Sequence, residues 1–221
     1  MKITAIIAGL MLFCGVAHAQ KGLHAGLKGA PQSTWMFNGD DSDNANWLYV
    51  PTFRSSFGAN FAWFFSDAVG LGVDVIYSNQ GQRFELDGMD LFTKTNYLKI
   101  PVLFHYHSGF DGTAFFYLNA GPQFAILSSA TAQTDVPILG PLGVDVTDGY
   151  SALNIGAVLA LGSGFHLTDF LQLTVGIRLD AGFTDAEDKS GPFFAGQTNR
   201  PATYNVTGGL ELGVRYVLRT N

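Results

Sequence analysis

Apolar and polar side chains alternate along most of the chain after residue 20, and this alternation is the clearest pattern in the sequence. Between residues 171 and 180, leucine, valine and isoleucine fill the odd positions, while the even positions hold glutamine, threonine, glycine, arginine and aspartate. A period of two is the signature of a β-strand, whose successive side chains point to opposite faces. Eight segments follow this pattern, at residues 23–28, 53–63, 69–78, 97–106, 113–128, 151–165, 169–183 and 202–219.

The connections between these segments vary in length in a regular way. Long connections at residues 38–50, 79–91, 129–150 and 184–201 alternate with short ones at 65–68, 108–112 and 166–169. Barrels of bacterial outer membranes have an even number of strands, each of about 9–11 residues, with short periplasmic turns and longer external loops. The sequence therefore predicts an all-β fold, an eight-stranded antiparallel up-and-down transmembrane β-barrel with extracellular long loops.

The first residues have the features of an export signal. Lys2 precedes a short apolar run, and Ala17-His18-Ala19 gives the small-x-small pattern of a signal-peptidase site. We expect residues 1–19 to be a signal peptide and residues 20–221 to form one barrel domain. The single cysteine, Cys14, falls within the predicted signal, so the mature domain would have neither a disulfide nor thiolate chemistry.

The composition favours a membrane surface over an aqueous one. Charged residues make up only 14% of the chain, compared with about 25% in soluble domains. Aromatic residues make up another 14% and cluster where the predicted strands end, as expected for belts at the two membrane interfaces. We therefore expect the outer surface to contact outer-membrane lipid. The net charge of −6 argues against a nucleic-acid partner.

Charged residues recur on the strand face opposite the apolar one, and this face is predicted to line the lumen. An eight-stranded barrel is just wide enough for its own side chains to fill it. Because buried charges are tolerated when they are paired or hydrated, we expect a polar plug instead of an open pore. The predicted lumen charge network consists of Lys28, Arg54, Asp74, Lys99, Arg178, Asp180, Glu211 and Arg215.

Two proline-bearing segments carry a resemblance to a known family. The run Tyr97-Leu98-Lys99-Ile100-Pro101-Val102-Leu103 and the later Ala120-Gly121-Pro122 are similar to those of the outer-membrane β-barrel family that includes the PorT-like proteins. The resemblance extends over nearly the whole mature chain. It implies a porin-like barrel, and some family members assist a system that secretes proteins across the outer membrane. Each proline removes a donor from the ladder, and we expect a local bulge at each.

The sequence offers no convincing catalytic pattern. The histidines that follow the predicted signal lack a recognisable nucleophile with an orienting acid. His107 and Ser108 are adjacent, which on a strand would point them to opposite faces. Acidic residues in the first and last long connections could hold a divalent cation, but their spacing matches no calcium loop. We therefore expect no catalytic residue, no metal site and no cofactor.

Two of the long connections carry apolar residues at positions expected to be exposed. Such residues mark partner contacts or pack over the barrel mouth, and the sequence leaves both open. The residues concerned are Val136, Ile138, Leu139, Leu142, Phe193 and Phe194. We expect a structural or interaction barrel that docks a membrane or secretion-complex protein through the 129–150 loop. A narrow passive porin-like channel is the alternative, and a lipid-modifying barrel enzyme has less support.

Overall fold

The computed structural model describes residues 21–43, 48–86, 89–110, 113–136, 140–194, 197 and 199–219. The predicted signal peptide, residues 1–19, lies outside the described residues. The elements in chain order are β1 (Gly22–Phe37), α2 (Gly39–Asp43), β2 (Leu48–Val50), β3 (Thr52–Phe64), β4 (Val69–Leu86), β5 (Met89–Phe110), β6 (Ala114–Val136), β7 (Gly140–Asp145), the 3-10 turn η1 (Thr147–Gly149), β8 (Leu153–His166), β9 (Leu171–Gly182) and β10 (Tyr204–Arg219). Among the described residues, no helix has the length and apolar character needed to cross a membrane.

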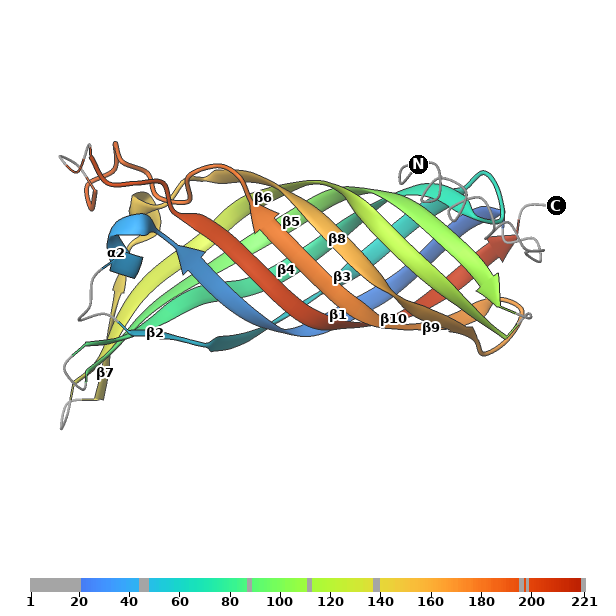
Figure 1. Cartoon of the computed structure of the whole chain (residues 1–221), viewed down its shortest axis with the longest axis horizontal. Coiled ribbons are helices and arrows are strands. Elements are labelled where there is room, and N and C mark those ends of the chain that lie inside the picture. Colours follow the sequence, from blue (N-terminus) through green and yellow to red (C-terminus); the bar gives the residue numbers. More distant parts are fainter. Residues whose placement is uncertain are drawn as a thin grey trace, which may run out of the picture.

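Eight of the ten strands in the described residues form a closed antiparallel ring (Figure 1). Each ring strand pairs with the next one in the chain, in the order β1, β3, β4, β5, β6, β8, β9 and β10. The ring closes where β10 pairs with β1, over a ladder from Gly22↔Arg219 to Phe37↔Tyr204. Closure leaves no sheet edge whose backbone N–H and C=O groups would be unpaired in the hydrocarbon core of the membrane. The predicted eight-stranded up-and-down barrel is confirmed.

The two ends of the barrel differ (Figure 1). One end carries the turns between β3 and β4, β5 and β6, and β8 and β9, together with the start of β1 and the end of β10. The other end carries α2, β2, β7 and the long connection between β9 and β10. In outer-membrane barrels the short turns face the periplasm. We therefore call the two ends the periplasmic end and the extracellular end.

Two connections that we predicted to be long loops are largely strand. β4 and β5 stay paired up to Leu86↔Met89, across most of residues 79–91. β6 continues to Val136, and β7 folds back on it within the predicted 129–150 loop. The alternation signal ends early because residues 79–82 are polar or glycine on both faces of the strand. Backbone pairing continues past that point, since it does not depend on an apolar face.

Burial alternates along the ring strands in the predicted sense. In β9 the even positions from Gln172 to Asp180 are buried, while the odd positions are partly or fully exposed. The exposed side chains of the barrel wall are mainly leucine, isoleucine, valine and phenylalanine, and the buried ones are mainly polar. The polar core of this fold therefore lies inside the ring, and the apolar surface lies outside, as in barrels that face lipid.

Pro101 and Pro122 lie in β5 and β6, where we predicted a bulge at each. The register of the two strands is instead the same on both sides of the prolines, from Pro101↔Gln123 to Phe104↔Ala120. The two residue pairs in between are not part of the hydrogen-bonded ladder. The register shift of this strand pair lies between Asn96 and Tyr97, nearer the extracellular end. The bulge prediction was wrong because each proline removes only its own donor. The bonds on both sides keep the strands in register.

Candidate functional site

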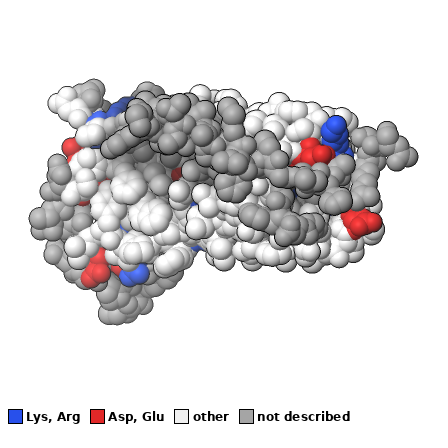
Figure 2. Space-filling view, turned by 45° about the vertical axis from the view of Figure 1, so that its right-hand side comes forward, with Lys and Arg blue, Asp and Glu red and all other residues white. Residues whose placement is uncertain are grey.

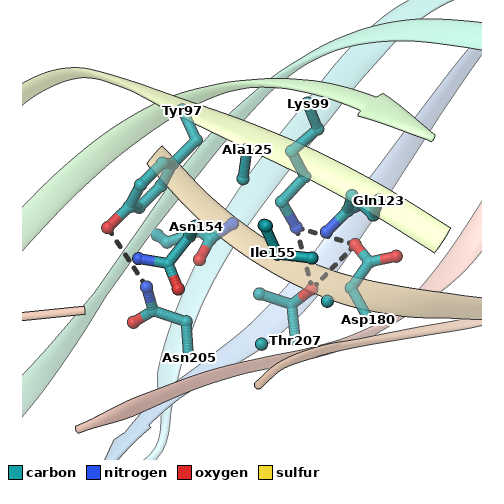
Figure 3. Close-up of a pocket in the computed structure, with 12 residues that line it drawn as sticks. Tyr97, Lys99, Gln123, Ala125, Asn154, Ile155, Asp180, Asn205 and Thr207 are labelled. Carbon is teal, nitrogen blue, oxygen red and sulfur yellow. Dashed lines mark hydrogen bonds and ion pairs between the residues drawn. The ribbon is translucent and has the colours of Figure 1, made fainter. Parts of the chain in front are cut away.

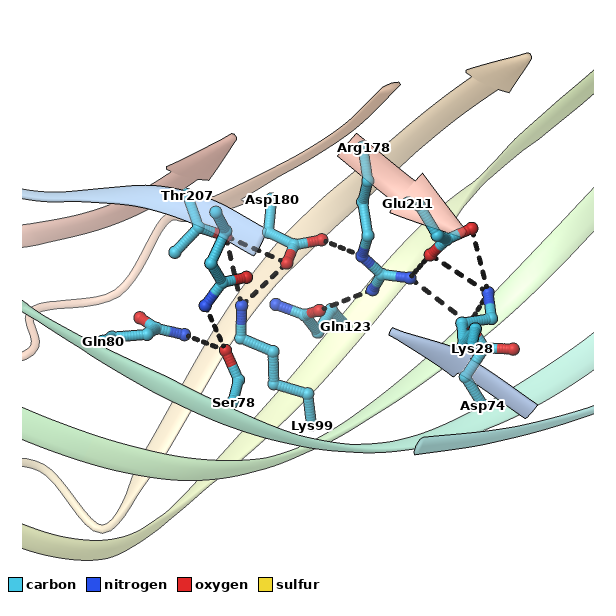
Figure 4. Close-up of polar contacts among 11 residues, drawn as sticks. Lys28, Asp74, Ser78, Gln80, Lys99, Gln123, Arg178, Asp180, Thr207 and Glu211 are labelled. Carbon is cyan, nitrogen blue, oxygen red and sulfur yellow. Dashed lines mark hydrogen bonds and ion pairs between the residues drawn. The ribbon is translucent and has the colours of Figure 1, made fainter. Parts of the chain in front are cut away.

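A layer of charged side chains crosses the middle of the lumen (Figure 4). Its members come from five barrel strands, and each occupies an inward-facing position of its strand. They are Lys28 of β1, Asp74 of β4, Lys99 of β5, Arg178 and Asp180 of β9, and Glu211 of β10. We call these six residues the lumen plug.

Arg178 lies at the centre of the plug and contacts all three carboxylates. Its Nε donates to Oδ1 of Asp180 at 2.9 Å, and its Nη1 donates to Oε2 of Glu211 at 3.2 Å. The same Nη1 lies 3.4 Å from Oδ2 of Asp74, and Nη2 lies 3.4 Å from Oε1 of Gln123 on β6. A planar guanidinium has five donors in fixed directions, so it can join several acceptors at once.

The two lysines complete the plug on either side of this centre. Nζ of Lys28 lies 2.8 Å from Oδ2 of Asp74 and 3.3 Å from Oε2 of Glu211. Nζ of Lys99 lies 2.7 Å from Oδ2 of Asp180. All these side chains are at most 9% exposed. Removing a charge from water costs several kcal/mol, which only close partners offset. The six groups therefore depend on one another.

Two of the predicted lumen charges lie apart from the plug. Arg54 lies on the inward face of β3 at its extracellular end, is half-buried, and has its Nη1 3.5 Å from the carbonyl oxygen of Phe53. Arg215 is buried toward the periplasmic end and has its Nη1 3.2 Å from Nε2 of His107. Alternation indicates the face of a strand. It does not indicate the height at which residues meet across the lumen, which depends on the stagger of the strands.

Small cavities lie on both sides of the plug. The extracellular one has a volume of about 20 Å³, and in it Nδ2 of Asn205 donates to the hydroxyl of Tyr97 at 3.1 Å (Figure 3). The periplasmic one has a volume of about 10 Å³ and is lined by Lys28 and Arg215, among others. One water molecule needs about 10–15 Å³. Each of these two cavities therefore has room for about one water molecule, and the side chains of the plug between them are at most 9% exposed.

A second polar cluster lies at the extracellular end and was missed by the sequence analysis. Arg200, between β9 and β10, donates to Asp41 at 2.9 and 2.8 Å and to Glu187 at 2.7 and 2.8 Å. The hydrogen bonds to Glu187 and Asp41 raise the pKa of Arg200 above its usual value. The cluster ties α2 to the last connection. The sequence signal for this cluster was a single arginine, Arg200, in a connection rich in acidic residues. Asp41 and Glu187, two of the acidic residues considered as possible cation ligands, are paired with this arginine in the structure.

Buried histidines pack among aromatic rings at the periplasmic end. The centroid of the Phe64 ring lies 4.4 Å from that of His24, 5.7 Å from that of His105 and 4.5 Å from that of His107. The ring of Phe115 lies 4.7 Å from that of His107 on the other side. These rings fill the periplasmic part of the lumen.

The predicted partner residues of the 129–150 segment lie near the tip of the β6–β7 hairpin. Val136 is the last residue of β6, and Leu142 lies in β7 with 53% of its surface exposed. Val144, two residues further along β7, is 60% exposed. Ile138 and Leu139 lie outside the described residues. The exposed apolar side chains described here therefore belong to a strand instead of a loop.

The two phenylalanines of the last connection pack over the turn that precedes β8. The ring of Phe194 meets that of Tyr150 edge to face, with centroids 6.0 Å apart. Phe193 lies against Gly149, whose added Cβ would be 3.1 Å from the Phe193 ring. Phe194 therefore contacts Tyr150 within the chain, while 46% of the surface of Phe193 is exposed.

The outer surface between the two ends is largely uncharged. Figure 2 shows the visible charged side chains gathered toward the ends of the molecule. The exposed apolar residues of the wall include Leu27, Phe57, Phe61, Leu71, Ile177, Leu179 and Leu212. An exposed apolar surface of this extent is typical of a membrane contact. The closed ring, the short periplasmic turns and this surface together define an integral β-barrel protein of the outer membrane.

Comparison with family models agrees with this class. Residues 18–188 match the family described as outer membrane protein beta-barrel domain, and the chain belongs to this family. It is therefore a protein of the bacterial outer membrane, embedded in its lipid. The match ends before β10, the strand that closes the ring against β1.

Solved structures with a similar fold have low sequence identity. Neisserial surface protein A is 16% identical, with 91% of this chain and 99% of that chain covered and a TM-score of 0.50. OprG from Pseudomonas aeruginosa is 12% identical, with 93% and 100% covered and a TM-score of 0.48. The outer membrane protease OmpT from Escherichia coli is 7% identical, with 93% and 100% covered and a TM-score of 0.36. The likeness to Neisserial surface protein A shows the fold alone. A comparison with curated proteins finds no significant match.

Proposed function

We propose that this protein is a non-enzymatic outer-membrane barrel with a sealed lumen, which acts by binding a protein partner at its extracellular end. The lumen plug is the observation that carries this proposal. A small barrel filled by its own paired side chains has little room for a path through the membrane. Its function is then expected at its surfaces, and the open edge of β7 is the surface that best suits a partner.

A passive channel is the alternative that the plug disfavours, and we expect the purified protein to give no stepwise conductance in planar lipid bilayers. The triple variant Lys99→Ala, Arg178→Ala, Asp180→Ala removes the extracellular half of the plug and keeps the ion pairs of Lys28. We expect conductance to appear in this variant because the removed side chains leave a hydrated gap.

Both proteins are first shown to be folded by their heat-modifiable migration on gels. Steady conductance of the unmodified protein would contradict the sealed lumen and favour the channel. A silent but folded triple variant would mean that other side chains also block the path.

The environment of the histidines supports a non-enzymatic role. A hydrolytic site needs a nucleophile within hydrogen-bond reach of a base, and a third group that orients the base. His105 and His107 instead lie against the ring of Phe64. Nε2 of His107 lies 3.2 Å from Nη1 of Arg215. Because a guanidinium can only donate, this nitrogen of His107 accepts a hydrogen bond from Arg215 and does not face a nucleophile there.

β7 has the features of a docking strand. Among the described strands it pairs with β6 alone, so its second edge is open. The amide of Val146 donates to the carbonyl of Ala130 at 3.0 Å. Amides alternate in direction along an antiparallel strand, so the amide of Gly143 points to the open edge. The side chains of Leu142 and Val144, the residues on either side of Gly143, are apolar and exposed. Such an edge suits an extended segment of a partner protein, which would add a strand.

Gly143→Pro is expected to abolish co-purification of this partner in a pull-down of tagged protein from mildly solubilised outer membranes. Proline removes the donor that faces the open edge and leaves the bonds to β6 in place. Deletion of residues 136–142 should have the same effect. Phe193→Ser, in the other apolar connection, is the control and should keep the partner.

Loss of the partner with Phe193→Ser but not with Gly143→Pro would move the docking site to the last connection. Recovery of the unmodified barrel alone would contradict partner binding altogether.

A finer proposal is that the partner belongs to a protein-secretion complex. The resemblance of residues 97–103 and 120–122 to the PorT-like family is its support. Large membrane proteins recovered in fixed proportion with the barrel would favour it. A soluble or extracellular partner would remove the secretion role and keep the docking strand.

A further inference from the structure

Arg215 is a buried cation that forms no ion pair with a carboxylate among the described residues. Its side chain is 6% exposed, and its guanidinium donates to Nε2 of His107 at 3.2 Å. A guanidinium has five donors and stays protonated in proteins. A hydrogen bond from one of these donors to an imidazole nitrogen does not balance the charge. A buried charge of this kind costs several kcal/mol unless something nearby compensates it.

The described part of the lumen below the extracellular rim is not balanced in charge. It contains four largely buried cations, Lys28, Lys99, Arg178 and Arg215, and three buried carboxylates, Asp74, Asp180 and Glu211. The ion pairs of the plug engage all three carboxylates. One positive charge is left over, and Arg215 is the residue that carries it.

The cavity of about 10 Å³ on the periplasmic side of the plug is lined by Arg215, Tyr117 and Asn119, among others. The buried hydroxyl of Tyr117 has no hydrogen-bond partner among the described residues. Glu211 also lines the cavity, but both of its oxygens already accept hydrogen bonds from Lys28. Tyr117 and Arg215 thus both line a cavity whose volume is near that of one water molecule, about 10–15 Å³.

We propose that Arg215 and Tyr117 form a binding site for one small monovalent anion of halide size, in the periplasmic half of the lumen. The anion accepts hydrogen bonds from the guanidinium and the hydroxyl, and it balances the remaining positive charge. It thereby extends the lumen plug toward the periplasm. Water is the competing occupant, because it would satisfy the donors but leave the charge unbalanced.

Bromide distinguishes the two occupants by its anomalous scattering. In crystals of the unmodified, detergent-folded protein grown in bromide, we expect an anomalous peak in the cavity beside Arg215 and Tyr117. Density at this position without an anomalous signal would identify water and overturn the proposal.

The melting midpoint in detergent gives a second test. Replacing gluconate with chloride at constant ionic strength should raise the midpoint of the unmodified protein by about 2–4 °C, because an anion that binds only the folded state stabilises it. Arg215→Gln should lose this dependence. Arg54→Gln, which changes an inward-facing arginine outside the site, should keep it.

A midpoint of the unmodified protein that does not respond to chloride would overturn the proposal, as would an equal response in Arg215→Gln. Should Arg215→Gln fail to fold, the bromide experiment decides, because it uses only the unmodified chain.

Discussion

Replacing Asp180 with asparagine is expected to lower the free energy of unfolding of the barrel by about 3–5 kcal/mol. Oδ2 of Asp180 lies 2.7 Å from Nζ of Lys99, and its Oδ1 lies 2.9 Å from Nε of Arg178. Among the described residues, Asp180 is the one carboxylate that pairs with Lys99. The substitution preserves the shape of the side chain and leaves a buried ammonium against a neutral amide. Urea titration of the protein folded in detergent micelles measures the loss.

A second substitution tests whether the loss of stability comes from the unpaired charge of Lys99. Adding Lys99→Gln to Asp180→Asn removes the orphaned charge, so the double variant should be more stable than Asp180→Asn alone. Glu85→Gln makes the same chemical change at an exposed carboxylate on the extension of β4 and should change stability by less than about 0.5 kcal/mol. An Asp180→Asn variant as stable as the unmodified protein would contradict a plug held by paired charges.

Gly121→Ala is expected to destabilise the barrel by about 3 kcal/mol or more, near the upper end of the cost of overpacking. A Cβ at Gly121 would lie 1.9 Å from the carbonyl oxygen of Val102 on the facing strand. That oxygen is backbone, so the two strands would have to separate. This separation would occur at a point where Pro101 and Pro122 already lack the backbone donors that join the two strands. The fraction of protein that reaches the compact, heat-modifiable form on refolding measures the effect.

Gly29→Ala provides the matched control within β1. A Cβ at Gly29 would lie 3.4 Å from the carbonyl oxygen of Ser56, which is an ordinary contact distance. The change should leave stability unaltered or raise it by about 0.4–1 kcal/mol, because alanine restricts the unfolded chain. Similar losses at both glycines would show that the close approach at Gly121 does not limit folding.

Much of the fold could be predicted because a period of two is a local property of the chain. Each residue of a strand points to one face or the other, and lipid outside with a filled lumen inside imposes opposite chemistry on the two faces. Residues 171–180 therefore reveal the inward position of Arg178 and Asp180 without any knowledge of their neighbours. The even number of strands and the alternating connection lengths then predict closure.

The ends of the strands could not be predicted in the same way. In the paired extensions of β4 and β5 the buried face is itself polar, since Gln80, Gln82 and Thr95 are at most 3% exposed, so these segments show no apolar alternation. The predicted bulges at the prolines of β5 and β6 were wrong for a related reason. A missing donor can be read from the sequence, but whether the strand bulges depends on how strongly the neighbouring bonds hold the register.

The sequence by itself determined the class of fold, the membrane-facing surface and the inward position of each lumen charge. The tertiary structure alone decided which of these charges meet. Lys28 and Glu211 are 183 positions apart and pair because β1 and β10 are neighbours in the closed ring. Arg54 and Arg215 stand apart from the plug because they lie at other heights. Contacts across a lumen depend on ring closure and strand stagger, which are properties of the whole barrel and not of any one strand.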